Sequence, residues 1–135
     1  SLEEKKTELY SYYDSEETKR NLPWRDRLVA YYTAHIIDSV LVFLKTYHEL
    51  VTRFNVAVEK ELSTPCKIYM KISSEFIGKY LVIRVDGLYE HLDGLYATVK
   101  NKKLRSLLFE ALRELALFEE RVSPIVEEIT DNLDY

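Results

Sequence analysis

The sequence predicts an all-α protein, an antiparallel bundle of three long helices preceded by a short N-terminal helix. Only three glycines and three prolines occur in 135 residues, too few for a turn-dense β-sandwich or barrel. Apolar residues recur at helical spacing through most of the chain. The apolar content of 47% and the net charge of −4 suit one folded domain, which we expect to span residues 1–135.

The first expected helix covers residues 3–20. It is polar and charged, with Leu9, Tyr10 and Tyr13 as its apolar side. Asn21-Leu22-Pro23 ends it, because proline restricts the residue before it and favours the start of a new helix. We therefore expect a short helix that stands apart from the three long ones.

The second expected helix covers residues 24–62 and carries two adjacent apolar seams. Two seams make a face wider than a two-stranded coiled coil requires, so this helix should contact two partners. Ser63-Thr64-Pro65 follows it, a sequence in which serine or threonine caps the next helix and proline fits its first turn. The seams consist of Ile36, Val40, Phe43, Tyr47, Leu50, Phe54 and Ala57, and of Ile37, Leu41, Leu44, Val51, Val58 and Leu62.

The third expected helix, residues 65–100, has mixed signals. Apolar residues alternate at spacings of four and three from Leu81 to Val99, which favours helix. The strand-like run Tyr80–Val85 is followed by Asp86-Gly87, which is a hairpin signal. We favour helix because the repeat is longer than the strand-like runs. The alternative is an α+β fold with a small sheet within 66–99.

The fourth expected helix, residues 102–133, has one continuous apolar stripe, with Lys, Arg and Glu on its other face. Ser123-Pro124 should kink or restart this helix, because an internal proline removes a backbone hydrogen bond. The short connections make helices that are neighbours in sequence antiparallel. The stripe consists of Leu104, Leu108, Ala111, Leu115, Phe118, Val122, Ile125 and Ile129.

Four residues are candidate metal ligands. A hairpin around residue 63 would bring His35 and Asp38 level with Glu90 and His91. Two imidazoles and two carboxylates suit Zn, Fe or Mn. However, His35 and Asp38 fall on the polar side of their helix, and the Glu-x-x-His pattern of di-iron bundles does not occur. We therefore expect a solvated face, with no metal and no other cofactor.

A second polar pair is His48 with Glu119. Glu119 falls within the apolar stripe of the last helix, and His48 lies at the edge of the apolar face of the second. Because a buried carboxylate usually needs a partner, we interpret them as a possible structural pair. Cys66, the one cysteine, has no histidine beside it, and the sequence contains no phosphate loop, hydrolase elbow or HExxH motif. The sequence thus predicts no catalytic residue and no enzyme.

One end of the expected bundle is basic. Arg25 and Arg27 follow Trp24, and Lys102 and Lys103 begin the last helix. Basic side chains around an exposed aromatic ring can contact nucleic acid through phosphates and stacking. Acidic residues outnumber basic ones in the segments nearby, so we do not expect nucleic acid as the partner. A small helical subunit of a nucleoprotein complex is one alternative function.

Surplus apolar surface predicts association. Gly87 and Gly94 belong to a repeat, DGLYEHL followed by DGLYATV, which places both on nearly one face of a helix. Close approach of another helix or subunit would explain two internal glycines, and Phe109 and Leu117 lie off the main stripe of the last helix. We predict a non-enzymatic helical interaction protein that forms a homodimer or binds another protein. A metal-binding or enzymatic bundle is the other alternative.

Composition also bears on the setting. The chain has no glutamine and four asparagines, a shortage typical of thermophilic proteins. The first residues lack the apolar segment of a signal peptide. The most apolar stretch, residues 28–51, is interrupted by His35, Asp38 and Lys45, which disfavours a membrane span. We expect a cytoplasmic protein with no membrane partner.

Overall fold

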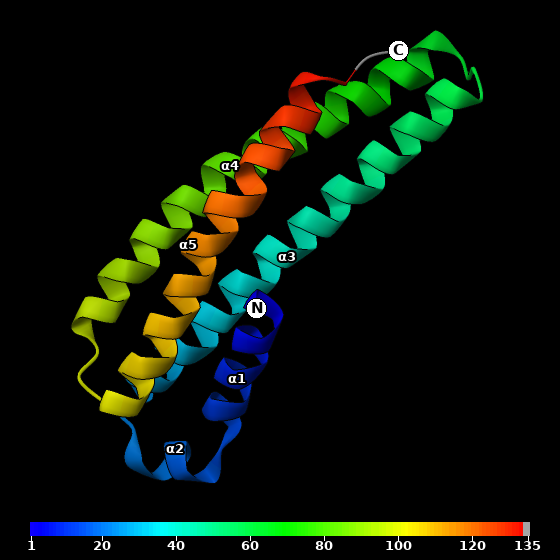
Figure 1. Cartoon of the computed structure of the whole chain (residues 1–135). Coiled ribbons are helices and arrows are strands. Elements are labelled where there is room, and N and C mark those ends of the chain that lie inside the picture. The colour runs from blue at the N-terminus through cyan, green and yellow to red at the C-terminus, as the bar shows by residue number, and fades with distance from the viewer. Residues whose placement is uncertain (134–135) are drawn as a thin grey trace.

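The computed structural model describes residues 1–133, which form five helices and contain no strand. The predicted all-α bundle is confirmed, and the alternative sheet within 66–99 is wrong, because that segment is one continuous helix. Figure 1 shows three long helices side by side, with the N-terminal helix against half the length of the bundle. The helices are α1 (Leu2–Asp14), α2 (Glu16–Asn21), α3 (Trp24–Glu59), α4 (Thr64–Thr98) and α5 (Lys102–Asp131).

The segment expected as one helix over 3–20 is two helices that meet at Ser15. Ser15 has extended backbone angles, and its hydroxyl accepts a hydrogen bond of 3.2 Å from the Thr18 N–H, so it caps α2. At the start of α1, Ser1 and Glu4 form a reciprocal capping box. The helix break therefore comes from a serine cap inside a polar segment, where the apolar periodicity does not predict it.

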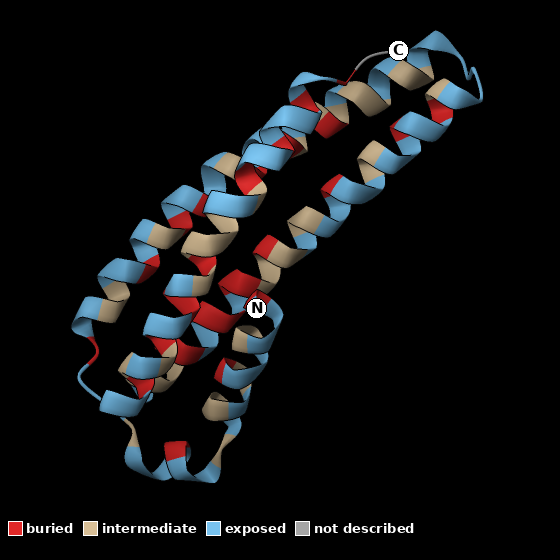
Figure 2. Ribbon diagram, viewed as in Figure 1, coloured by how far each residue is buried: buried red, intermediate tan, exposed pale blue. Residues whose placement is uncertain are grey.

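Helix α3 packs mainly against two helices, α1 and α4, as its broad apolar face predicts, and it makes smaller contacts with α5 and α2. Ala30 and Ala34 of α3 are fully buried, and Leu9 of α1 belongs to the same core. Figure 2 shows buried residues recurring along each of the long helices. Among the residues that the structure describes, α3 is the one helix long and apolar enough to cross a membrane, a property that core helices of soluble proteins share.

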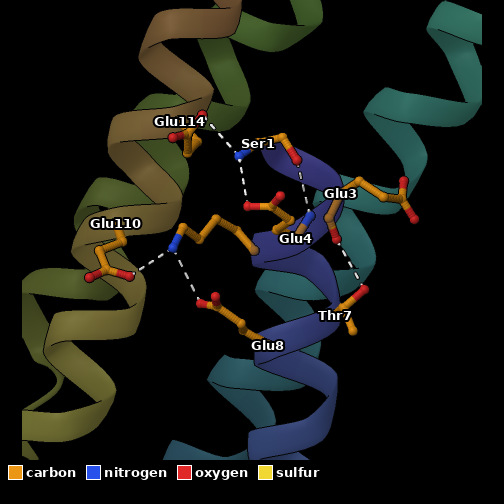
Figure 3. Close-up of polar contacts among 8 residues, drawn as sticks. Ser1, Glu3, Glu4, Thr7, Glu8, Glu110 and Glu114 are labelled. Carbon is orange, nitrogen blue, oxygen red and sulfur yellow. Dashed lines mark hydrogen bonds and ion pairs between the residues drawn. The ribbon is translucent and has the colours of Figure 1, made fainter.

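Ion pairs on the surface join α1 to its neighbours. Lys5 Nζ lies 2.9 Å from a carboxylate oxygen of Glu110 on α5 and 3.3 Å from one of Glu8 (Figure 3). On the other side of α1, Lys6 Nζ lies 3.2 Å from Asp38 on α3. Exposed pairs of this kind contribute little free energy, about 0–1 kcal/mol each, so burial of Leu9 holds α1 in place.

The α3–α4 connection is longer than expected, because α3 ends at Glu59 and not at residue 62, which leaves residues 60–63 between the two helices. Glu61 has φ 52°, in the left-handed region. The Leu62 N–H donates to the Ala57 carbonyl (3.0 Å), and the Glu61 N–H donates to the Val58 carbonyl (3.1 Å). These bonds are those of a Schellman motif, in which glycine is the usual residue at the left-handed position.

Helix α5 runs through Pro124 as one element, so, of the kink or restart predicted at Ser123-Pro124, the restart is wrong. Its inner face packs against α4, and its N-terminal half also contacts α1. Since α1 reaches only half of α3 in Figure 1, the molecule has four helices at one end and three at the other. At the transition, a groove between α3 and α5 is lined by Leu41, Leu44, Leu117, Phe118 and Val122.

Candidate functional site

Helix α4 carries more exposed large apolar side chains than any other helix in the described chain. Tyr69, Phe76 and Ile83 are 71%, 68% and 73% exposed, and they are spaced seven residues apart. They belong to a row of eight positions that alternate in spacing between four and three, which places them on one face of the helix. We call this row the outer seam: Tyr69, Ser73, Phe76, Tyr80, Ile83, Gly87, Glu90 and Gly94.

The outer seam is distinct from the face that α4 buries. Leu81, Val85, Leu88 and Leu92 are the buried members of the apolar repeat found in the sequence, and they belong to the core. The outer seam repeats at the same period on another side of the helix, and every member except Ser73 is exposed. Helix α4 therefore has two seams, and within residues 1–133 only the inner one is covered along its length by other helices.

Aromatic packing holds the middle of the outer seam in position. The rings of Phe76 and Tyr80 stack with centroids 6.5 Å apart and planes at 12°. The Tyr80 ring also lies 5.2 Å from Phe43 on α3. These contacts restrict the rotamers of Phe76 and Tyr80 before any partner binds. Less side-chain entropy would therefore be lost when a partner covers the outer seam.

Three glycines interrupt α4, and they differ sharply in their surroundings. A Cβ atom at Gly78 would lie 2.5 Å from Thr130 Oγ1 and 2.8 Å from the Tyr47 ring, so close packing inside the bundle requires glycine there. At Gly87 and Gly94, a Cβ atom would meet nothing within 4 Å. Each of these two exposed glycines costs about 1 kcal/mol relative to alanine without any packing benefit inside the chain. They leave two open notches on the outer seam.

The structure does not bring the four candidate metal ligands together. Asp38 pairs with Lys6 of α1 (3.2 Å), and the His35 ring stacks on Tyr31 with centroids 6.3 Å apart. His91 points to α3 instead, with its Nε2 atom 3.0 Å from the Tyr32 hydroxyl, while Glu90 is exposed. Within residues 1–133, no group of three or more His, Cys, Asp and Glu side chains could hold a metal ion.

The hairpin register explains this separation. The contacts Tyr32–His91 and Arg25–Thr98 join α3 to α4 at positions symmetric about a point between Glu61 and Leu62. The expected pivot was residue 63, so α4 is shifted along α3 by about one helical turn from the predicted level. The early end of α3 at Glu59 accounts for the shift.

The expected pair of His48 and Glu119 does not form in the described chain. His48 is exposed, whereas Glu119 is half-buried and faces α4. Burial raises the pKa of Glu119, and the neighbouring Asp86 raises it further through its negative charge and a hydrogen bond, with a smaller effect from Glu90. The carboxylates of Glu119, Asp86 and Glu90 thus lie near one another at the α4–α5 contact.

The basic residues do meet at one end of the bundle. Arg25 Nη2 donates to Thr98 Oγ1 (2.8 Å), and the Arg27 guanidinium lies 4.7 Å from the centre of the Tyr13 ring. Lys103 lies over the Tyr12 ring at 5.6 Å, and Lys102 is exposed. Two of the four cations thus lie over the chain's own tyrosine rings, while Trp24, the ring expected to stack on a nucleic acid, is exposed.

The two remaining interface candidates lie on α5. Phe109 is exposed and contacts the Tyr96 ring, with centroids 6.4 Å apart. Leu117 is half-buried and lines the groove between α3 and α5. Neither extends the outer seam, whereas Gly87 and Gly94 both belong to it. The sequence reasoning missed the other members of that seam, although their spacing could have revealed a second periodic face on the third helix.

No protein-family model, curated protein or solved structure matches the chain. The class that the fold and the site define is a helical bundle with one long helix face left without a partner.

Proposed function

We propose that the protein is a non-enzymatic, cytoplasmic interaction protein that associates with itself through its helical bundle. The outer seam supports this proposal. Three of its side chains, Tyr69, Phe76 and Ile83, expose about 70% or more of their surface in one row. A contiguous apolar patch of this kind on a soluble protein marks a partner site, because burying it removes apolar surface from water.

The shape of α4 favours another helix as the partner. The outer seam follows the spacing of four and three that knobs-into-holes packing uses, and it extends over most of a 35-residue helix. A second helix can therefore lie along it without any rearrangement of the bundle. Among soluble homo-oligomers, a two-fold dimer is the commonest arrangement, so the proposed assembly is a homodimer.

Multi-angle light scattering tests this proposal. Measured from low to high micromolar concentration, the protein should show a mass that rises from the chain mass of 16.0 kDa towards twice that value. Val42→Lys is a matched control, because Val42 is 54% exposed on α3 and lies outside the outer seam, so this variant should still dimerise. A mass that stays at 16.0 kDa at every concentration would contradict self-association.

A further inference from the structure

We propose that a second copy of the chain covers the outer seam in an antiparallel orientation. In this arrangement, Tyr69 and Phe76 of each copy sit in the notches at Gly94 and Gly87 of the other copy. This inference rests on the proposed function and adds the identity of the partner helix, its direction and its register.

The inference rests on the spacing of aromatic residues and glycines along α4. Tyr69 and Phe76 are seven residues apart, and so are Gly87 and Gly94, and all four belong to the outer seam. An antiparallel helix pair brings together residues that are equally far from the two-fold axis on either side. An axis level with the Leu81–Val82 peptide satisfies this condition for both aromatic–glycine pairs at once.

The same axis also pairs the remaining members of the outer seam. Tyr80 comes opposite Ile83 of the second copy, next to the axis, where two apolar side chains from each helix would be most deeply buried. Ser73 comes opposite Glu90 of the second copy, and a serine hydroxyl can donate to a carboxylate. All eight positions of the outer seam therefore meet a chemically compatible neighbour.

A parallel pair would lack this fit. It would place Tyr69 against Tyr69 and Phe76 against Phe76, while the glycines of the two copies would face each other across an unfilled gap. Close packing is the general property of stable protein contacts, and voids lose dispersion contacts. The arrangement of large side chains in one half of α4 and exposed glycines in the other half thus selects the antiparallel direction.

The chain itself shows how glycine serves α4. At Gly78, the missing side chain lets Tyr47 of α3 and Thr130 of α5 approach the α4 backbone. Gly87 and Gly94 repeat that device on the outer side of the same helix, where nothing in the described chain fills the space. The proposed dimer gives them the role that Gly78 has inside the bundle.

Compensating substitutions test the register. Gly87→Leu fills one notch and should raise the dimer dissociation constant about tenfold or more, because overpacking a tight contact is unfavourable. Adding Phe76→Ala, which shortens the side chain predicted to face residue 87 of the second copy, should restore most of the affinity. Adding Tyr69→Ala instead should not, because Tyr69 faces Gly94. Circular dichroism melts of each variant verify folding.

A distance measurement tests the direction independently. Cys66 is the one cysteine of the chain and lies near the start of α4, so a nitroxide attached to it reports where the two helices begin. The antiparallel dimer predicts a separation of about 45–50 Å, whereas parallel helices predict roughly 10–20 Å. Light scattering on the labelled protein first establishes that it is still a dimer.

The outcomes separate the two proposals. A dimer that gives the short distance, or whose affinity Gly87→Leu leaves unchanged, overturns the antiparallel register and leaves self-association standing. A protein that stays monomeric at high micromolar concentration overturns both. The long distance together with rescue by Phe76→Ala, and without rescue by Tyr69→Ala, is the result that the proposal predicts.

Discussion

The hydroxyl of Tyr47 on α3 lies 2.7 Å from Thr130 Oγ1 on α5 and donates a hydrogen bond of 3.1 Å to the Val126 carbonyl. The contact passes over Gly78 of α4, where any side chain would collide with both residues. It joins α3 to the last turns of α5 and packs against α4, in the part of the bundle that Figure 1 shows beyond α1. The three-helix end of the bundle thus depends on one buried polar contact as well as on apolar packing.

Tyr47→Phe should lower the free energy of unfolding by about 1–2 kcal/mol. The substitution removes the hydroxyl but keeps the ring, so the Val126 carbonyl and Thr130 lose a partner in a site that is 3% exposed at Tyr47. Urea denaturation followed by circular dichroism measures the change. Tyr31→Phe is the control, because Tyr31 is 43% exposed and its variant should unfold like the unmodified protein.

Alanine at Gly78 and alanine at Gly87 should have opposite effects. Gly78→Ala should destabilise the fold by about 1–3 kcal/mol, because its Cβ would press on Thr130 and Tyr47. Gly87→Ala should stabilise the monomer by up to about 1 kcal/mol, because the site is open and alanine favours helix. Both are measured in an Ile83→Lys background, so that association does not contribute. Equal effects at the two sites would contradict the assigned environments.

Glu61→Gly should raise the free energy of unfolding by about 1 kcal/mol. Glu61 adopts φ 52° at the end of α3, a conformation that costs a non-glycine residue roughly this amount. The two backbone hydrogen bonds that close the helix, from the N–H groups of residues 61 and 62, do not involve the side chain. Thermal melts of the variant and of Glu61→Ala decide the matter, since only glycine should stabilise.

Glu119→Gln should change how stability depends on pH. The pKa of Glu119 is raised above its ordinary value in the fold, so its contribution is fully present below about pH 4.5 and is lost as pH rises through the folded-state pKa. The neutral variant should therefore melt about 1–3 °C higher than the unmodified protein at pH 7, and the difference should shrink at pH 4. A constant difference at both values would contradict the pKa direction.

The long helices and their buried faces follow directly from the sequence, since apolar spacing reports which side of a helix is covered. The repeat from Leu81 to Val99 outweighed the local strand signals because burial along a whole helix stabilises more than the propensity of a few residues. Asp86-Gly87 predicts a hairpin only when the apolar repeat on either side of it is ignored. In the structure, this dipeptide lies inside α4.

The features that escaped prediction are of two kinds. The break at Ser15 and the end of α3 at Glu59 depend on caps of one or two residues, which apolar periodicity does not register. The contact of Gly78 with Tyr47 and Thr130 depends on how three helices are rotated about their axes. A sequence gives the order of residues along each helix, but the rotation arises only from packing.

In the candidate site, too, the sequence predicts the position of residues along each helix but not the direction in which they face. Gly87 and Gly94 were identifiable as unusual from their repeat, but their exposure depends on which face of α4 the other helices cover. The candidate metal ligands were expected to be nearly level along the bundle. In the structure, Asp38 pairs with Lys6 of α1, His35 stacks on Tyr31 of its own helix, and His91 turns towards Tyr32. A shift of about one turn and a difference in rotation were enough to separate them.

Sedimentation equilibrium of the unmodified protein beside its Ile83→Lys variant tests the central claim most directly. Ile83 is 73% exposed and lies next to the proposed two-fold axis, so a lysine there should abolish association without disturbing the fold. The account predicts a monomer–dimer equilibrium for the unmodified chain and a monomer of 16.0 kDa for Ile83→Lys. Identical masses for the two proteins across the concentration range would contradict it.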